Sequence, residues 1–118
     1  MKLELPTLAE GETYVGALGD QAGNLTHIIL LPGDNDDNTW KKQLAWAKKQ
    51  GGDLPTRLEL SLAWHNCPEQ FKKDWYWSNE QRAAYSDCAW CQTFGLGLQT
   101  RNRTSSKLRA RAVRRLPI

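Results

Sequence analysis

The side chains in this sequence best suited to chemistry are its three cysteines and two histidines. His65 and Cys67 form a His-x-Cys pair, and Cys88 and Cys91 form a Cys-x-x-Cys pair. Together the four have the composition of a Cys₃His zinc site, and the Cys-x-x-Cys half has the spacing of zinc ligands. The His-x-Cys half lacks that spacing, and both pairs fall on regular elements rather than on turns. We therefore interpret the cysteines as core residues and expect no bound metal and no cofactor.

Redox, disulfide and catalytic chemistry are disfavoured as well. The Cys88-x-x-Cys91 motif begins no helix that would lower a thiol pKa. The cysteines are odd in number, and the opening MKLELPTLAEGE contains no apolar signal-peptide core, so we expect no disulfide framework. His27 lies in an apolar run, and no serine or cysteine is tied to either histidine by a known triad or elbow motif. We expect a protein that is not an enzyme.

The acidic run Asp34-Asn-Asp-Asp-Asn38 offers alternating oxygen atoms, as a calcium-binding loop does. A calcium loop requires glycine at its sixth position and glutamate at its twelfth, where this sequence has Thr39 and Ala45. We interpret the run as a polar loop that caps the helix following it.

Length and composition are those of one globular domain. The chain has 118 residues, of which 40% are hydrophobic and 25% charged. We assign residues 1–118 to a single domain with a short N-terminal lead at 1–10. No apolar run approaches the ~20 residues that cross a bilayer, so we expect no membrane segment.

Charge is distributed unevenly along the chain. Acids are concentrated in residues 1–59, and none follows Asp87, whereas basic residues recur at Arg101, Arg103, Lys107, Arg109, Arg111, Arg114 and Arg115. One interpretation is a nucleic-acid partner for the stretch 101–115. The other is a solvated terminal hairpin in which some arginines pair with acids such as Asp53 or Glu59. We favour the second, because no aromatic residues interleave the run.

Two helices are predicted between groups of strands. Apolar runs at 12–20 and 25–32 predict a hairpin that turns at 21–24. A first helix follows Asn38 or Thr39, either of which could cap it, and ends at Gly51–Gly52. A second helix begins at Thr56, which forms a capping box with Glu59, and ends before Pro68.

The remaining segments read as strands at about 75–78, 89–94 and 107–116, with a turn at 95–98 that leads into 99–106. Trp75 and Trp77 share one face of the first of these, and Trp90 and Phe94 share a face of the second. We expect Trp75, Trp77 and Trp90 to be largely buried. The predicted fold class is α+β, with two amphipathic helices packed on one twisted antiparallel sheet.

Four segments in order resemble a known family: DLPTRLELSLAW at 53–64, WYWSNE at 75–80, AWCQTFGLG at 89–97 and RARAVRR at 109–115. The family is the one related to the C-terminal domain of the collagen-like adhesin Lcl, many of whose members are small phage or prophage proteins. The resemblance extends over about residues 10–117. It implies a C-type-lectin-like fold and implies no particular chemistry.

In that fold the last strands and their loops form the ligand face. The candidates for exposed ligand-binding residues are therefore Tyr76, Tyr85, Gln99, Arg101, Asn102 and Arg103. The first functional hypothesis is a non-catalytic, phage- or prophage-type module that binds a protein or glycan through loops between residues 78 and 107. The alternative is a stand-alone phage protein that inhibits a host factor, such as a nucleic-acid-directed defence system. Synthesis in the host cytoplasm is expected for both, with virion association open for the first.

Overall fold

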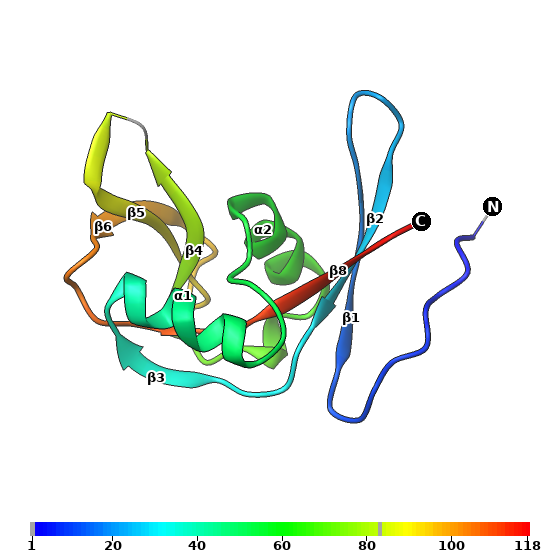
Figure 1. Cartoon of the computed structure of the whole chain (residues 1–118), viewed down its shortest axis with the longest axis horizontal. Coiled ribbons are helices and arrows are strands. Elements are labelled where there is room, and N and C mark those ends of the chain that lie inside the picture. Colours follow the sequence, from blue (N-terminus) through cyan, green and yellow to red (C-terminus); the bar gives the residue numbers. More distant parts are fainter. Residues whose placement is uncertain (1, 83) are drawn as a thin grey trace.

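The chain folds into two β-sheets and two α-helices (Figure 1). The structure is a computed structural model that describes residues 2–82 and 84–118, without the side chains of Arg82 and Tyr85. The α+β class predicted from the sequence is confirmed. In chain order the elements are β1 (Thr13–Gly19), β2 (Leu25–Leu30), β3 (Asn35–Asn38), α1 (Trp40–Lys49), α2 (Arg57–Asn66), the 3₁₀ turn η1 (Pro68–Gln70), β4 (Trp75–Arg82), β5 (Tyr85–Thr93), β6 (Gln99–Arg103), β7 (Leu108–Ala110) and β8 (Val113–Pro117).

The strands divide into an antiparallel sheet of order β1-β2-β8 and a five-stranded sheet of order β3-β7-β4-β5-β6. The expectation of one antiparallel sheet is wrong in two respects. The last basic stretch is not one strand, because it leaves the five-stranded sheet after Ala110 and enters the other sheet at Val113. In addition, β7 runs parallel to β4, with Tyr76 opposite Arg109.

The two helices begin and end close to where the sequence predicts. The capping box of α2 is confirmed: the Glu59 amide donates to Thr56 Oγ1 at 3.1 Å, and the Thr56 amide donates to Glu59 Oε1 at 2.9 Å. Thr39 is the N-cap residue of α1 but makes no side-chain cap. The Trp40 amide donates instead to the Thr104 carbonyl at 3.1 Å, so the start of α1 is held by the β6–β7 turn.

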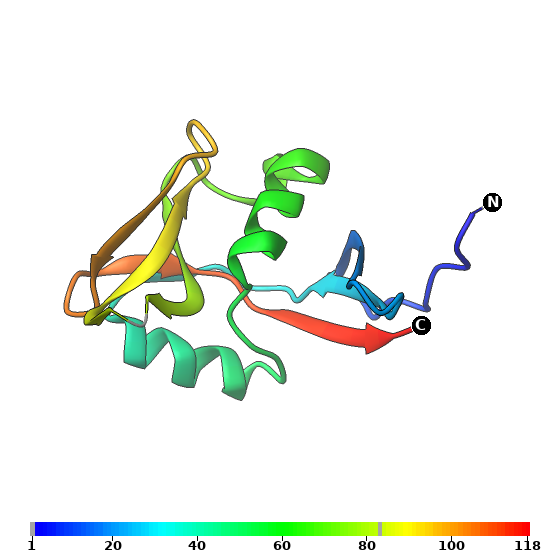
Figure 2. The same cartoon turned by 90° about the horizontal axis from the view of Figure 1, so that it is seen from above.

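The helices cover opposite faces of the five-stranded sheet, as Figure 2 shows from above. On the α2 side, Leu60 packs with Phe71, Tyr76 and Phe94, and on the α1 side Trp40 packs with Trp77. Because Tyr76 and Trp77 are neighbours in β4, their side chains enter different clusters.

The tryptophans are buried unequally. Trp77 is fully buried, and its Nε1 donates to the Asn38 carbonyl at 3.0 Å. Trp75 and Trp90 are less completely buried: Trp75 packs against the cluster on the α1 side, whereas Trp90 belongs to neither cluster. The Arg57 side chain, at the start of α2, lies over the Trp90 ring.

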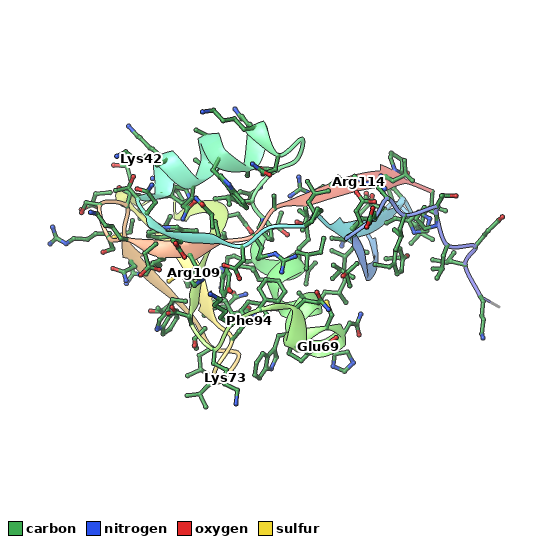
Figure 3. All side chains as sticks on the ribbon, turned by 90° about the horizontal axis from the view of Figure 1, so that it is seen from below. Lys42, Glu69, Lys73, Phe94, Arg109 and Arg114 are labelled. Carbon is green, nitrogen blue, oxygen red and sulfur yellow. The ribbon has the colours of Figure 1, made fainter. Side chains whose placement is uncertain are left out.

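The basic C-terminal stretch is tied internally, which confirms its pairing with acids of the first half. Each ion pair joins a C-terminal arginine to an acid far away in the sequence: Arg109 to Asp34 (2.9 Å) and Asp36 (3.1 Å), Arg114 to Glu12 (2.8 Å), and Arg115 to Glu59 (2.7 Å) and Asp53 (3.0 Å). Figure 3 shows Arg109 and Arg114 along this stretch. Arg111 is buried and donates to the Leu31 carbonyl at 2.9 Å.

The acidic run at 34–38 is not the capping loop predicted for it. Asn35–Asn38 forms β3, an edge strand that pairs with β7. Asp36 in this strand and Asp34 just before it bind the buried Arg109 guanidinium. The carboxylates therefore neutralise an arginine of the neighbouring strand. This role can be predicted only when the pairing of the strands is known.

Candidate functional site

One side of the β5–β6 pair carries aromatic and cationic side chains together. The register places Trp90 opposite Arg101 and Cys88 opposite Arg103. Directly opposed residues point to the same face of a sheet, and here it is the face that α2 covers. Since α2 begins at Arg57, the face is only partly covered at Trp90. We call the surface formed by Arg57, Trp90, Arg101 and Arg103 the Trp90 face.

Arg57 stands directly over Trp90. Its guanidinium carbon lies 3.5 Å from the centroid of the Trp90 ring, a cation–π contact. The Arg57 Nε donates to Gln99 Oε1 at 3.0 Å, and its backbone amide donates to Glu80 Oε2 at 2.6 Å. Its two Nη atoms have no hydrogen-bond partner within the described chain. They remain available to a carboxylate, which a guanidinium binds in a two-pronged geometry.

A chain of buried amides holds this arrangement in place. Gln92 is fully buried and donates from Nε2 to the Leu60 carbonyl of α2 at 2.9 Å. Gln99 donates to Gln92 Oε1 and to the Arg57 carbonyl, both at 2.8 Å. These bonds fix β5, β6 and the first turn of α2 relative to one another, so the Arg57 guanidinium is pre-positioned over the ring.

A shallow pocket of about 420 Å³ at the β5–β6 pair adjoins the Trp90 face at Arg101 and Arg103. It is lined by Asp87, Cys88, Thr100, Arg101, Asn102 and Arg103. Arg101 and Arg103 are exposed, while Asn102 Oδ1 accepts from the Arg103 amide and from Ser106 Oγ, both at 2.9 Å. The charged residues that line the pocket are Asp87, Arg101 and Arg103, so positive charge exceeds negative charge there.

The structure brings together four of the six predicted ligand residues. Arg101, Asn102 and Arg103 line one pocket, and Gln99 lies next to them in β6, although its amide is bonded to the protein itself. The side chain of Tyr85 lies outside the described residues. Positions 78–107 are largely strands rather than the loops that were expected.

The prediction of an exposed Tyr76 is wrong. The residue is fully buried in the cluster under α2, where its hydroxyl donates to Asp34 and accepts from the Lys72 amide at 2.9 Å. Burial, together with the Asp34 carboxylate, raises the pKa of Tyr76 to about 12. Strand alternation predicts that Tyr76 points to the other face of the sheet from Trp75 and Trp77. It does not predict that α2 covers that face.

Sequence reasoning missed the two residues that organise the surface. Arg57 follows the cap of α2 and has no local feature that marks it as functional. Trp90 was assigned to the core because tryptophan usually lies there. Their contact depends on where α2 begins over β5, which no local pattern encodes.

The cysteines do not come together as a zinc site. Cys67 packs in the cluster under α2 and Cys91 in the cluster under α1, on opposite faces of the sheet. Within residues 2–82 and 84–118, no group of three or more His, Cys, Asp and Glu side chains is placed to hold a metal ion. Burial raises the pKa of Cys67 to about 11 and that of Cys91 to about 12.

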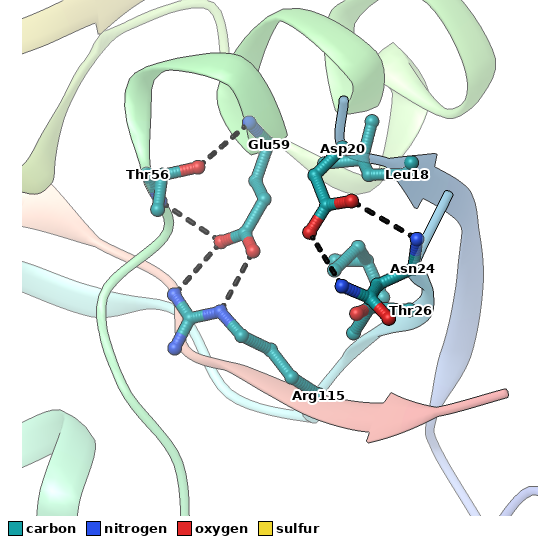
Figure 4. A pocket seen from close by; sticks show the side chains of 9 residues that line it. Leu18, Asp20, Asn24, Thr26, Thr56, Glu59 and Arg115 are labelled. Atoms are coloured by element: carbon teal, nitrogen blue, oxygen red, sulfur yellow. Dashed lines mark hydrogen bonds and ion pairs between the residues drawn. The ribbon is translucent and has the colours of Figure 1, made fainter. Parts of the chain in front are cut away.

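A second pocket, of about 330 Å³, lies between the β1–β2 hairpin and the start of α2 (Figure 4). Its polar side chains are bonded mainly to one another. Glu59 accepts from Arg115 and from the Thr56 amide, and Asp20 accepts from Asn24 at both carboxylate oxygens. This pocket is therefore less suited to a polar ligand than the Trp90 face.

Comparison with known proteins adds no assignment: no family model matches the chain, and no curated protein matches it. Neither helix of the described chain has the length and apolar character needed to span a bilayer.

Proposed function

We propose that the protein is a non-catalytic binding module of the C-type-lectin-like kind that recognises acidic side chains of a partner protein. The observation that carries the proposal is the Arg57 guanidinium, held over Trp90 beside the exposed Arg101 and Arg103. Tryptophan and arginine are the residues that most often dominate the energy of protein–protein contacts. Three guanidinium groups on one face favour carboxylates as the bound groups.

The C-type-lectin-like part of the proposal rests on the motif resemblance. The four segments that carry it form α2, β4, β5 with its following turn, and β7–β8. These elements include α2 and β5, which carry Arg57 and Trp90, whereas β6, which carries Arg101 and Arg103, lies outside the four segments. A phage or prophage origin, and either a virion or an intracellular role, follow from the same resemblance and not from the surface.

A glycan is a weaker candidate ligand than a protein. Sugars bind tryptophan by stacking on an open ring face, and the Arg57 guanidinium occupies one face of Trp90 at 3.5 Å. A protein carboxylate would instead bind the guanidinium and leave the stacking intact.

Nucleic acid is also a weaker candidate. Arg109, Arg114 and Arg115 are engaged by carboxylates, and Arg111 donates to backbone carbonyls. The stretch 101–115 therefore presents far fewer outward cations than its sequence suggests. Tight binding of a phosphate backbone depends on neutralising many phosphates at once.

Selection from a random peptide library displayed on yeast tests the proposal. The wild-type protein is the bait, and the double variant Arg101→Glu/Arg103→Glu is the counter-bait. We expect enriched peptides to be rich in Asp and Glu and to lose binding to the counter-bait. The variant Lys48→Glu/Lys49→Glu makes the same charge change at exposed residues of α1 and should bind as the wild type does. Enrichment of neutral or basic peptides, or equal binding by all three proteins, would contradict the proposal.

A further inference from the structure

An apolar pocket opens at the far end of α2 from the Trp90 face. It measures about 380 Å³ and is lined by Trp64, Pro68, Glu69, Phe71, Lys73, Phe94 and Gly95. Phe94 stacks on Phe71 with ring centroids 3.9 Å apart, and Trp64 meets Phe94 edge-on at 5.9 Å. Glu69 and Lys73 also line the pocket, so an acid and a base lie beside its aromatic rings, and Figure 3 labels both on the same side of the molecule as Phe94.

The β5–β6 turn beside this pocket exposes further apolar surface. Leu96 and Leu98 are 73% and 59% exposed. The turn is held against Trp64 at Gly97, where a Cβ atom would lie 2.6 Å from Trp64 Cε2 and where φ is +75°. Only glycine permits both this approach and this backbone conformation. The β5–β6 turn is therefore packed tightly against Trp64 in the absence of any ligand.

The N-terminal lead is a second apolar segment without a partner. Leu3, Leu5 and Leu8 are 40%, 62% and 37% exposed. The lead is anchored at its C-terminal end by the Ala9 amide, which donates to Glu12 Oε1 at 2.8 Å. Before Ala9, the described residues of the lead make no hydrogen bond. Figures 1 and 2 show the lead running away from the body of the molecule.

We propose that the lead of one copy docks in the Trp64–Phe94 pocket of a second copy. Leu3 and Leu5 lie two residues apart and point to the same side of an extended chain, so both can enter one apolar pocket. Lys2 and Glu4 flank Leu3 with one base and one acid, which complement Glu69 and Lys73 of the pocket. The contact joins different surfaces of the two copies, so association is head-to-tail. It involves no residue of the Trp90 face and is independent of the proposed function.

Sedimentation velocity of the full chain over a range of concentrations tests this contact. We expect the wild type to associate reversibly and Leu3→Gln/Leu5→Gln to weaken association by about tenfold or more. Leu58→Gln is the matched control, because Leu58 is 60% exposed but lies on α2 outside the pocket. It should change association by less than about twofold.

Exchanging the charges of Glu4 and Lys73 tests whether these two residues pair in the proposed contact. Glu4→Lys and Lys73→Glu should each weaken association by about two- to fivefold, and combining them in one chain should restore it. Both residues are exposed, so neither change threatens the fold. A wild type that stays monomeric at every concentration overturns the proposal, and so does association that is indifferent to the lead. Failure of the charge exchange to restore association overturns the pairing of Glu4 with Lys73.

Discussion

Arg115 of β8 and Glu59 of α2 form a two-pronged ion pair that ties the two sheets together. Arg115 Nε lies 2.7 Å from Glu59 Oε2, and its Nη2 lies 2.9 Å from Oε1. The Glu59 side chain is 4% exposed, and the same carboxylate completes the capping box of α2 (Figure 4). One side chain therefore caps a helix on the five-stranded sheet and anchors a strand of the other sheet.

Replacing this carboxylate should be costly. Glu59→Gln removes the buried one of the two carboxylates that pair with Arg115 and leaves Asp53, so we expect a loss of about 2–3 kcal/mol of unfolding free energy. Urea unfolding followed by tryptophan fluorescence measures the change. Glu69→Gln, at an exposed acid, should change the unfolding free energy by less than about 0.5 kcal/mol. Equal stability of the two variants would mean that the pair contributes little.

The pair of Glu12 and Arg114 predicts a specific acid sensitivity. The hydrogen bond from Arg114 lowers the pKa of Glu12 from 4.5 to about 2. The ionised carboxylate therefore favours the folded state above pH 4.5, and this contribution is lost as pH falls from 4.5 toward 2. The difference in unfolding free energy between wild type and Glu12→Gln should be constant near neutral pH and shrink across that acid range. A difference that does not depend on pH would refute the role of this pair.

The unequal burial of the tryptophans predicts unequal costs of substitution. Trp77→Ala removes a fully buried ring and should cost about 3–5 kcal/mol of unfolding free energy. Trp90→Ala removes a half-buried ring and should cost about 1–2 kcal/mol. Both values come from denaturant titration of the purified variants. A Trp90 variant that unfolds as readily as the Trp77 variant would contradict the placement of Trp90 at the surface.

The three cysteine thiols should differ in their rate of reaction with a thiol reagent, because one is more accessible than the other two. Cys67 and Cys91 are buried with raised pKa values of about 11 and 12, whereas Cys88 is half-buried in the pocket of the Trp90 face. At mildly alkaline pH, a disulfide reagent such as DTNB should modify Cys88 first, and the other two thiols only after unfolding. Rapid reaction of all three thiols in the native protein would show that the core placement is wrong.

Local sequence signals were sufficient wherever one segment determines its own structure. The capping box at Thr56 and Glu59, the glycine end of the first helix and the first hairpin are encoded within a few residues, and all were predicted. The division into two sheets was not, because it depends on the β7–β8 break and on the pairing of β7 with β3 and β4.

The same reasoning explains the candidate site. Exposed arginines at 101 and 103 were predicted from the ligand face that the family resemblance implies and from their place before the final strand. The contact between Arg57 and Trp90 joins residues 33 positions apart and depends on the amide chain through Gln92 and Gln99. Tyr76 was misplaced because alternation along β4 tells which residues share a face, but not that α2 covers the other face.

The location of the binding surface is the central claim, and chemical-shift mapping tests it directly. The probe is the acidic peptide most enriched by the wild-type protein, titrated into uniformly ¹⁵N-labelled protein. We predict that amide shifts concentrate at residues 87–92 and 99–103 and at Arg57, and that the Trp90 indole signal moves with them. Shifts that concentrate instead on the α1 lysines or on the Trp64–Phe94 pocket would contradict the account.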